Sequence, residues 1–120
     1  KEVIGLVNCA GITITKNSLN YKLKDWNKTI ATNLTAPFFL SQEVAKCMIK
    51  NKTKGSIINF TSISSELAMP DNPAYNSSKA GLKHLTKSLA VDLSKFGITD
   101  PEPYQMKKYV QEYLFPIFKI

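Results

Sequence analysis

Two short apolar segments, each followed by a long helical pattern, constrain the fold of this chain more than any other feature. Residues 3–9 and 56–62 are largely apolar and end in small or hydroxyl-bearing side chains, which is typical of buried parallel strands. Residues 25–50 and roughly 74–95 place apolar side chains near helical spacing. Strand, helix, strand and helix in this order predict an α/β fold in which the helices pack on a right-handed parallel sheet.

Three residues mark expected features of the two helices. Pro37 lies inside the first helical pattern, where its missing N–H predicts a kink. Asn33 falls on or near the apolar side of the same helix, where an amide needs hydrogen-bond partners. It is either a structural cap of a neighbouring backbone or part of a site. Gly97 is placed to end the second helix, and the polar residues 12–23 predict a loop.

A tyrosine and a lysine near the start of the second helix suggest proton-transfer chemistry. Tyr75 and Lys79 share a face of a helix, and an ammonium close to a phenol favours the phenolate. The same spacing recurs at Tyr104 and Lys108, so on spacing alone a surface pair is the simpler interpretation. Context separates the first pair from the second. A strand, Ser62 and a proline-bounded loop precede it, and open parallel sheets bind ligands at the carboxyl ends of their strands.

Four motifs in order along the chain carry a family resemblance. They are Leu6-Val7-Asn8-Cys9-Ala10-Gly11, Asn33 in Thr32-Asn33-Leu34, Gly55-Ser56-Ile57-Ile58-Asn59-Phe60-Thr61-Ser62, and Tyr75-x-x-x-Lys79 with Ser62 thirteen residues before the tyrosine. Over residues 3–98 the chain closely resembles the short-chain dehydrogenases/reductases. Cys9 stands where that family has the second asparagine of its Asn-Asn-Ala-Gly motif.

The resemblance implies a Rossmann-like fold and hydride exchange between a nicotinamide cofactor, NAD or NADP, and a ketone or secondary alcohol. It makes Tyr75 the general acid/base, because a phenol needs a fixed cation to act as a base at neutral pH. It makes Lys79 that cation and a ligand of the nicotinamide ribose. Ser62 hydrogen-bonds the substrate oxygen, and Asn33 holds a water in the proton path. The residues implied on the adenosine side of the cofactor are Asn8, Ala10 and Gly11.

The resemblance is incomplete towards both ends of the chain. The five glycines contain no cluster of the kind that binds the cofactor pyrophosphate. We therefore expect residues 1–98 to form an incomplete Rossmann-like domain, without its N-terminal βαβ units and glycine-rich loop. Residues 99–120 depart from the family pattern and predict a divergent helical tail with an aromatic face. A sheet shortened in this way exposes edges and apolar faces, so we expect weak cofactor binding or folding by association.

The composition argues against several other classes of function. The net charge is +7, and all sixteen basic residues are lysines, so the forked guanidinium typical of nucleic-acid sites is missing. Cys9, Cys47 and the single His84 do not give a metal site of familiar spacing. No secretion signal or long apolar span is visible, and a reducing cytoplasmic location is the default expectation.

Two functions remain open. The first is an NAD(P)-dependent oxidoreductase, or a piece of one, with a small carbonyl or alcohol substrate. A ketoacyl-thioester reductase and a sugar or polyol dehydrogenase are the leading substrate classes by resemblance. The second is a catalytically silent homologue that acts by association. The two long helices commonly form the dimer interface in the family, so a homo-oligomer suits both functions, and neither nucleic acid nor a membrane is an expected partner.

Overall fold

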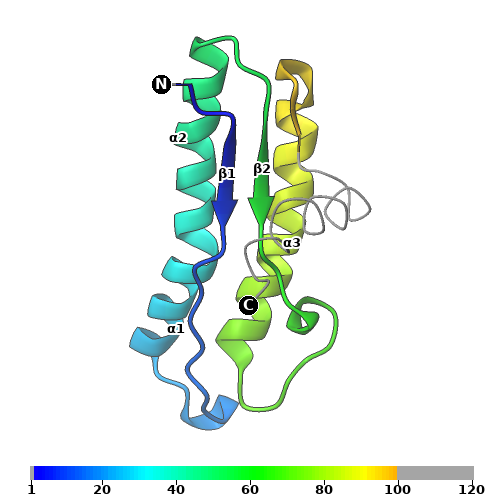
Figure 1. Ribbon diagram of the computed structural model, residues 1–120. Coiled ribbons are helices and arrows are strands. Elements are labelled where there is room, and N and C mark those ends of the chain that lie inside the picture. The colour runs from blue at the N-terminus through cyan, green and yellow to red at the C-terminus, as the bar shows by residue number, and fades with distance from the viewer. Residues whose placement is uncertain (1, 100–120) are drawn as a thin grey trace, which may run out of the picture.

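The chain forms a three-stranded parallel sheet with helices packed against it. The computed structural model describes residues 2–99. In sheet order the strands are β1 (Gly5–Asn8), β2 (Gly55–Asn59) and β3 (Ile98–Thr99) (Figure 1). Both pairings are parallel, and the register sets Asn8 opposite Asn59 at the carboxyl end of the sheet. The predicted parallel α/β arrangement is confirmed.

The strands are shorter than the sequence predicts. β2 ends at Asn59 rather than at Ser62, because the next residue leaves the ladder. The Phe60 N–H makes the last bond to β1 at 3.0 Å, while the Phe60 carbonyl accepts a bond from Lys79 Nζ at 2.7 Å instead of from a strand. β3 falls where the sequence predicts the start of the divergent tail. Its two residues pair with the first two of β2, a match too short to leave a periodic pattern.

The first predicted helix is interrupted. It consists of α1 (Leu23–Ile30), a π-helical segment (Ala31–Thr35) and α2 (Ala36–Lys50). A single helix over residues 25–50 is therefore wrong in detail. The sequence predicts a kink at Pro37, and the structure has a π-helical segment just before it. Pro37 has no N–H to donate to the Asn33 carbonyl four residues earlier, and the turn before it widens.

The second predicted helix is observed with nearly the expected bounds. α3 runs over Pro73–Leu93, and a 3₁₀ turn at Ser94–Phe96 continues it. Gly97 ends this helix with a φ of +70°, as predicted. Two further 3₁₀ turns lie in the connections, at Ser18–Asn20 and Ile63–Ser65.

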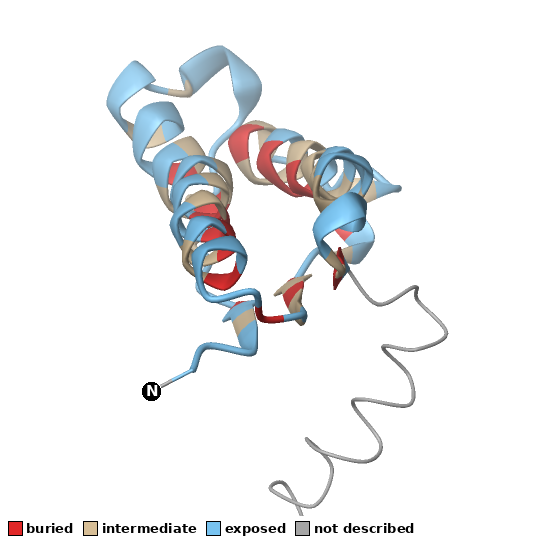
Figure 2. Cartoon of the chain, turned by 90° about the horizontal axis from the view of Figure 1, so that it is seen from above, coloured by how far each residue is buried: buried red, intermediate tan, exposed pale blue. Residues whose placement is uncertain are grey.

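The helices cover one face of the sheet. Seen from above, α2 and α3 lie on the same side of the strands, and their buried residues turn inwards (Figure 2). The centre of this core is made of Ala45, Met48, Ile57 and Ile98. Val7 is 53% exposed and alternates along β1 with the buried Asn8, and within residues 2–99 no helix covers the face opposite to Asn8. Fully parallel sheets are normally covered on both faces, so the expected open apolar face is confirmed.

Some expectations fall outside the described part of the chain. The predicted helical tail, the boundary after residue 98 and the pair Tyr104/Lys108 involve residues that the structure does not describe. Between residues 2 and 99, no helix has the length and hydropathy needed to cross a membrane. The same residues contain no cluster of three or more potential metal ligands.

Candidate active site

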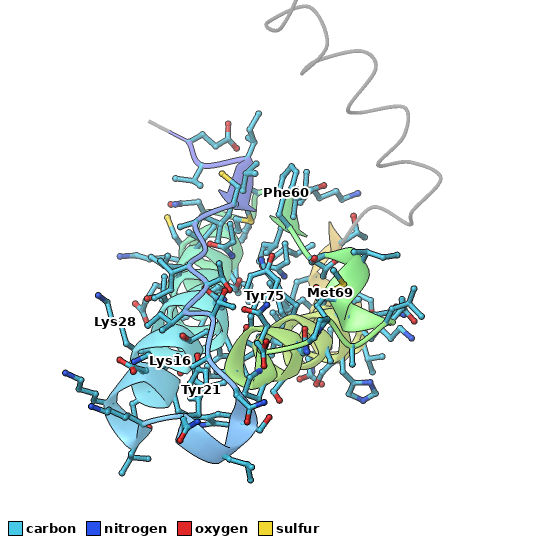
Figure 3. The ribbon with its side chains drawn as sticks, turned by 90° about the horizontal axis from the view of Figure 1, so that it is seen from below. Lys16, Tyr21, Lys28, Phe60, Met69 and Tyr75 are labelled. Atoms are coloured by element: carbon cyan, nitrogen blue, oxygen red, sulfur yellow. The ribbon has the colours of Figure 1, made fainter. Side chains whose placement is uncertain are left out.

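A cavity of about 550 Å³ opens at the carboxyl end of the sheet. Three parts of the chain line it: the loop after β1, the end of β2, and the turn before α3 together with the start of that helix. Figure 3 shows Tyr75 between the loop after β1 and the segment that carries Met69, with Phe60 beyond it. The cavity therefore lies where parallel sheets bind their ligands.

Lys79 is a buried cation in the wall of this cavity. Its side chain is 5% exposed, and Nζ donates to the Phe60 carbonyl at 2.7 Å. Nζ also lies 5.8 Å from the centroid of the Tyr75 ring, within reach of a cation–π contact. α3 produces this arrangement because Tyr75 stands in its first turn and Lys79 one turn later. An ammonium has three donors, so two remain for a ligand after the bond to Phe60.

Asn33 connects the π-helical segment to both walls of the site. It is fully buried, and its amide exchanges two bonds of 2.8 Å with the backbone N–H and carbonyl of Ile12. Asn33 Nδ2 also donates to Ser78 Oγ at 3.0 Å, and Ser78 Oγ donates to the Tyr75 carbonyl at 2.8 Å. The side chain thus caps a neighbouring backbone, which is one of the two interpretations the sequence left open.

Gly11 lies beside both Lys79 and Asn33. A Cβ built at this position would lie 3.5 Å from Lys79 Nζ and 3.6 Å from Asn33 Oδ1. Gly11, Lys79 and Tyr75 also line the same cavity. Four of the candidate residues therefore meet in one place, although they come from three separate segments of the chain.

Ser62 lies next to this group. Its neighbour Thr61 lines the cavity, whereas Ser62 itself is outside the lining. Ser62 precedes the 3₁₀ turn at Ile63–Ser65, and its Oγ accepts a bond from Ser64 N at 3.2 Å. A contact between Ser62 and a substrate oxygen stays a prediction.

Asn8 and Ala10 occupy different environments. Asn8 Nδ2 points into the protein and donates to Asn59 Oδ1 at 2.8 Å and to Ser41 Oγ at 3.2 Å. Asn59 Nδ2 in turn donates to Thr86 Oγ1 of α3 at 3.0 Å. Ala10 is exposed. The Asn8 side chain therefore fixes the ends of β1 and β2, and Ala10 stays available to a ligand.

Sequence reasoning did not single out Asn59 and Thr86. The available signal was the position of Asn59 at the end of an apolar run, matched by Asn8 at the end of the other run. Two amides at equivalent ends of neighbouring parallel strands are well placed to bond to each other, because such ends meet at one edge of the sheet.

One carboxyl outside the cavity lining has a pKa shifted by its surroundings. The Lys16 ammonium donates to Asp25 Oδ2 at 2.7 Å. This hydrogen bond, with the charges of Lys16, Lys24 and Lys22, holds the pKa of the Asp25 carboxyl below its usual value. The pair ties the loop after β1 to the first turn of α1.

Comparison with known proteins gives the family. The family model described as short chain dehydrogenase matches residues 1–100. The 3-oxoacyl-[acyl-carrier-protein] reductase of Synechocystis sp. is 42% identical over 94 residues, which make up 78% of this chain and 38% of the reductase. The chain thus spans less than half the length of this relative.

Solved structures agree. A 4-hydroxyisoleucine dehydrogenase complexed with NADH is 41% identical, with a TM-score of 0.77 over 78% of this chain and 41% of that one. A putative 2-deoxy-d-gluconate 3-dehydrogenase from Agrobacterium tumefaciens with bound NADP is 34% identical, with a TM-score of 0.77 over 79% of this chain and 39% of that one. The fold is thus Rossmann-like, and the chain belongs to the short-chain dehydrogenase family.

Proposed function

We propose that this chain carries the proton-transfer centre of an NAD- or NADP-dependent oxidoreductase that interconverts a ketone and a secondary alcohol. One observation carries the proposal: the buried Lys79 ammonium stands beside the Tyr75 ring in the wall of a cavity large enough for a small ligand. Burial removes hydration from the Lys79 ammonium, and its one bond, to the Phe60 carbonyl, leaves two of its three donors for a ligand. A phenol that acts as a general base needs a fixed positive charge nearby, and the Lys79 ammonium is the candidate to supply it.

Tyr75 is the proposed general acid/base. In the direction of reduction its hydroxyl gives a proton to the substrate oxygen, and in the direction of oxidation its phenolate takes that proton back. Lys79 stabilises the phenolate, and its two remaining donors suit the ribose hydroxyls of a nicotinamide nucleotide. The cofactor, when bound, supplies or accepts the hydride.

Ser62 and Asn33 are proposed to assist. The Ser62 hydroxyl accepts a bond from Ser64 N, which leaves its own hydrogen to donate to the substrate oxygen. Pro37 cannot donate to the Asn33 carbonyl, so this oxygen has no partner at the usual helical position and suits a water in the proton path. The Asn33 side chain meanwhile fixes the segment.

The residues after β1 fit the cofactor in part. Gly11 offers backbone that a ligand can approach closely, and Ala10 is small and exposed. The side-chain amide of Asn8 is already bonded to Asn59, so we propose that Asn8 supports the cofactor site by fixing the ends of β1 and β2. We assign these residues to the adenosine side of the cofactor. Because the five glycines of the chain form no cluster of the kind that binds a pyrophosphate, we expect the chain by itself to bind cofactor weakly or not at all.

A second function is favoured by the exposed apolar surface. Leu23, Phe39 and Leu40, on α1 and α2, are 74%, 54% and 51% exposed, and the sheet has an open apolar face. A catalytically silent homologue that works by association could use these surfaces. Self-association through the long helices is part of both proposals.

Two measurements separate these functions. Calorimetric titration of the purified chain with NADH and NADPH tests cofactor binding, and micromolar affinity would overturn the expected weak binding. Turnover of a ketone panel, with Tyr75→Phe as the matched control, tests catalysis. Activity that disappears in Tyr75→Phe supports the enzyme, and a folded chain inactive in both forms supports the silent homologue.

A graft distinguishes an incomplete enzyme from a silent one. Residues 3–98 of this chain replace the matching segment of the Synechocystis reductase, which supplies the remainder of a complete domain. If Tyr75 carries the proton, the graft reduces ketones and its Tyr75→Phe form loses about 100-fold or more in rate, a typical general acid–base contribution. A graft that binds NADPH yet reduces no ketone would refute the proposed role of these residues.

A further inference from the structure

The loop after β1 and the turn before α3 are bonded to each other beside the cavity. Thr13 Oγ1 and Thr15 Oγ1 both donate to Asn72 Oδ1, at 2.8 and 3.1 Å. Asn72 Nδ2 donates to the Pro70 carbonyl at 3.0 Å, which holds the amide in this orientation. Thr13, Thr15 and Asn72 all line the cavity that contains Tyr75. We refer to Asn72, Thr13 and Thr15 as the Asn72 clasp.

The residue before Asn72 makes a second connection to the same loop. Lys16 N donates to the Asp71 carbonyl at 2.7 Å, and Asn17 Nδ2 donates to Asp71 Oδ1 at 3.2 Å. Asp71 has a φ of +56°, a conformation that is uncommon for residues other than glycine and that aspartate tolerates better than most. Contacts from the loop after β1 thus help to hold the shape of this turn.

Asn72 occupies the N-cap position of α3 without capping it. An asparagine there normally accepts a bond from the first turn of its own helix. No such bond forms at Asn72, whose side-chain oxygen is directed to Thr13 and Thr15 instead. A helix cap is thus replaced by a bond between two loops, three residues before Tyr75.

The clasp also determines what the cavity wall can donate. A threonine hydroxyl has one donor, and both threonines use it on Asn72. They can therefore accept a bond from a substrate but cannot donate to its carbonyl oxygen. Among the hydroxyls of the clasp and of Tyr75, the phenol is the one left to donate to that oxygen.

We propose that Asn72 is a positioning residue, which fixes the distance between the two loops and thereby holds the substrate at Tyr75. The inference rests on the proposed function, because the clasp residues line the cavity in which the substrate of that function would bind. If Asn72 were only structural, its substitution would change the free energy of unfolding alone. If it is a positioning residue, its substitution loosens both loops together and raises the KM for substrate.

Deuterium uptake tests the clasp in the whole chain, independently of activity. Asn72→Ala and the double variant Thr13→Val/Thr15→Val are expected to raise uptake in residues 12–17 and 69–73 together. Asn72→Asp keeps an oxygen that can accept from both threonines but loses the bond from Nδ2 to the Pro70 carbonyl, so its uptake should lie between those of the unmodified chain and Asn72→Ala. Asn20→Ala, which removes an exposed amide from the same connection, should change neither segment. Unchanged uptake in Asn72→Ala, or a rise in one segment alone, would overturn the clasp.

Kinetics of the chain, or of the graft, test the positioning role. We expect Asn72→Ala and the double threonine variant to raise the KM for ketone about tenfold, the effect of losing a hydrogen bond or two, with a smaller change in kcat. NADPH binding should stay the same, and Asn72→Asp should raise KM less than Asn72→Ala does, because it keeps the acceptor for the two threonines. An unchanged KM, or a loss confined to NADPH binding, contradicts the positioning role. If the graft reduces no ketone, the proposed function fails and the positioning role fails with it, while the uptake experiment still decides whether the clasp exists.

Discussion

The two ends of the sheet differ in how much space they leave beside a glycine. At the amino end, a Cβ on Gly55 would lie 2.7 Å from the Ile4 carbonyl oxygen and 2.7 Å from Met48 Cε, so the site has no room for a side chain. At the carboxyl end, a Cβ on Gly11 would meet Lys79 Nζ at 3.5 Å, an ordinary contact beside the cavity. The first glycine is required by packing, and the second leaves space for a ligand.

The same difference appears in the side chains around each end. Around Gly55 the interior is apolar and closed, with Met48 and Ile98 almost fully buried. Around Gly11 it is polar, and buried groups such as Asn33 and Lys79 bond to backbone atoms of neighbouring segments. Close packing supplies stability at the amino end, whereas at the carboxyl end fixed polar groups surround a hollow. Substitutions at the two ends should therefore have separable effects.

The largest effect is expected at Lys79. Lys79→Met keeps the length of the side chain but removes the ammonium from Tyr75 and from the Phe60 carbonyl. Turnover in the graft should fall about 100-fold or more, since the general base loses its cation. Lys83→Met is the matched control, because this lysine lies one turn further along α3 and pairs with Glu66. Equal losses in the two variants would show that the ammonium of Lys79 has no special role.

The two glycines test the comparison directly. Gly55→Ala should destabilise the chain by about 3 kcal/mol, the upper part of the usual range for overpacking, because backbone at Ile4 cannot move aside. Gly11→Ala should leave the free energy of unfolding nearly unchanged but weaken NADPH binding to the graft, since its methyl group enters the ligand's space. Urea unfolding and calorimetric titration measure the two quantities. If Gly11→Ala lowers the free energy of unfolding as much as Gly55→Ala does, the carboxyl end of the sheet is packed as closely as the amino end.

Asn59 tests whether the polar end also contributes stability. Asn59→Ala removes the partner of Asn8 Nδ2 and of Thr86 Oγ1 on the covered side of the sheet. Losing both hydrogen bonds of the Asn59 amide should cost about 2 kcal/mol in urea unfolding. Asn8 Nδ2 keeps its bond to Ser41 Oγ, and Thr86 Oγ1 keeps its bond to the Leu82 carbonyl. The control Asn27→Ala removes an exposed amide and should change stability little. If Asn59→Ala loses no more unfolding free energy than Asn27→Ala, water has replaced the missing amide.

These residues also show how far the sequence alone reaches. Periodicity, spacing and motif predict the parallel strands, the helix α3, its end at Gly97 and the closeness of Tyr75 to Lys79. The π-helical segment does not, because Pro37 predicts a disturbance but not whether the turn before it widens or breaks. β3 is too short to show a period.

The clasp could not be predicted for a different reason. Its donors and its acceptor are separated by 57 and 59 residues, and polar residues in loops have no periodic pattern that would pair them. Asn72 even sits where local rules predict a helix cap. Such long-range bonds between loops depend on the folded sheet that places the loops side by side.

The smallest effect is expected at Asp25, whose bond to Lys16 holds the loop after β1 against α1. Because the pKa of this carboxyl is lowered in the folded chain, the pair stabilises the fold above the usual pKa of 3.8 and stops doing so as the pH falls through the lower folded pKa. Asp25→Asn should therefore be slightly less stable than the unmodified chain at pH 7, and the difference should vanish in strong acid. It should also shrink in 1 M salt, because salt screens exposed charges. Asp92→Asn, on the exposed side of α3, is the control, and urea midpoints between pH 2 and 7 are the measurement. A difference that persists unchanged at pH 2 would assign the effect to packing of Asp25 rather than to its charge.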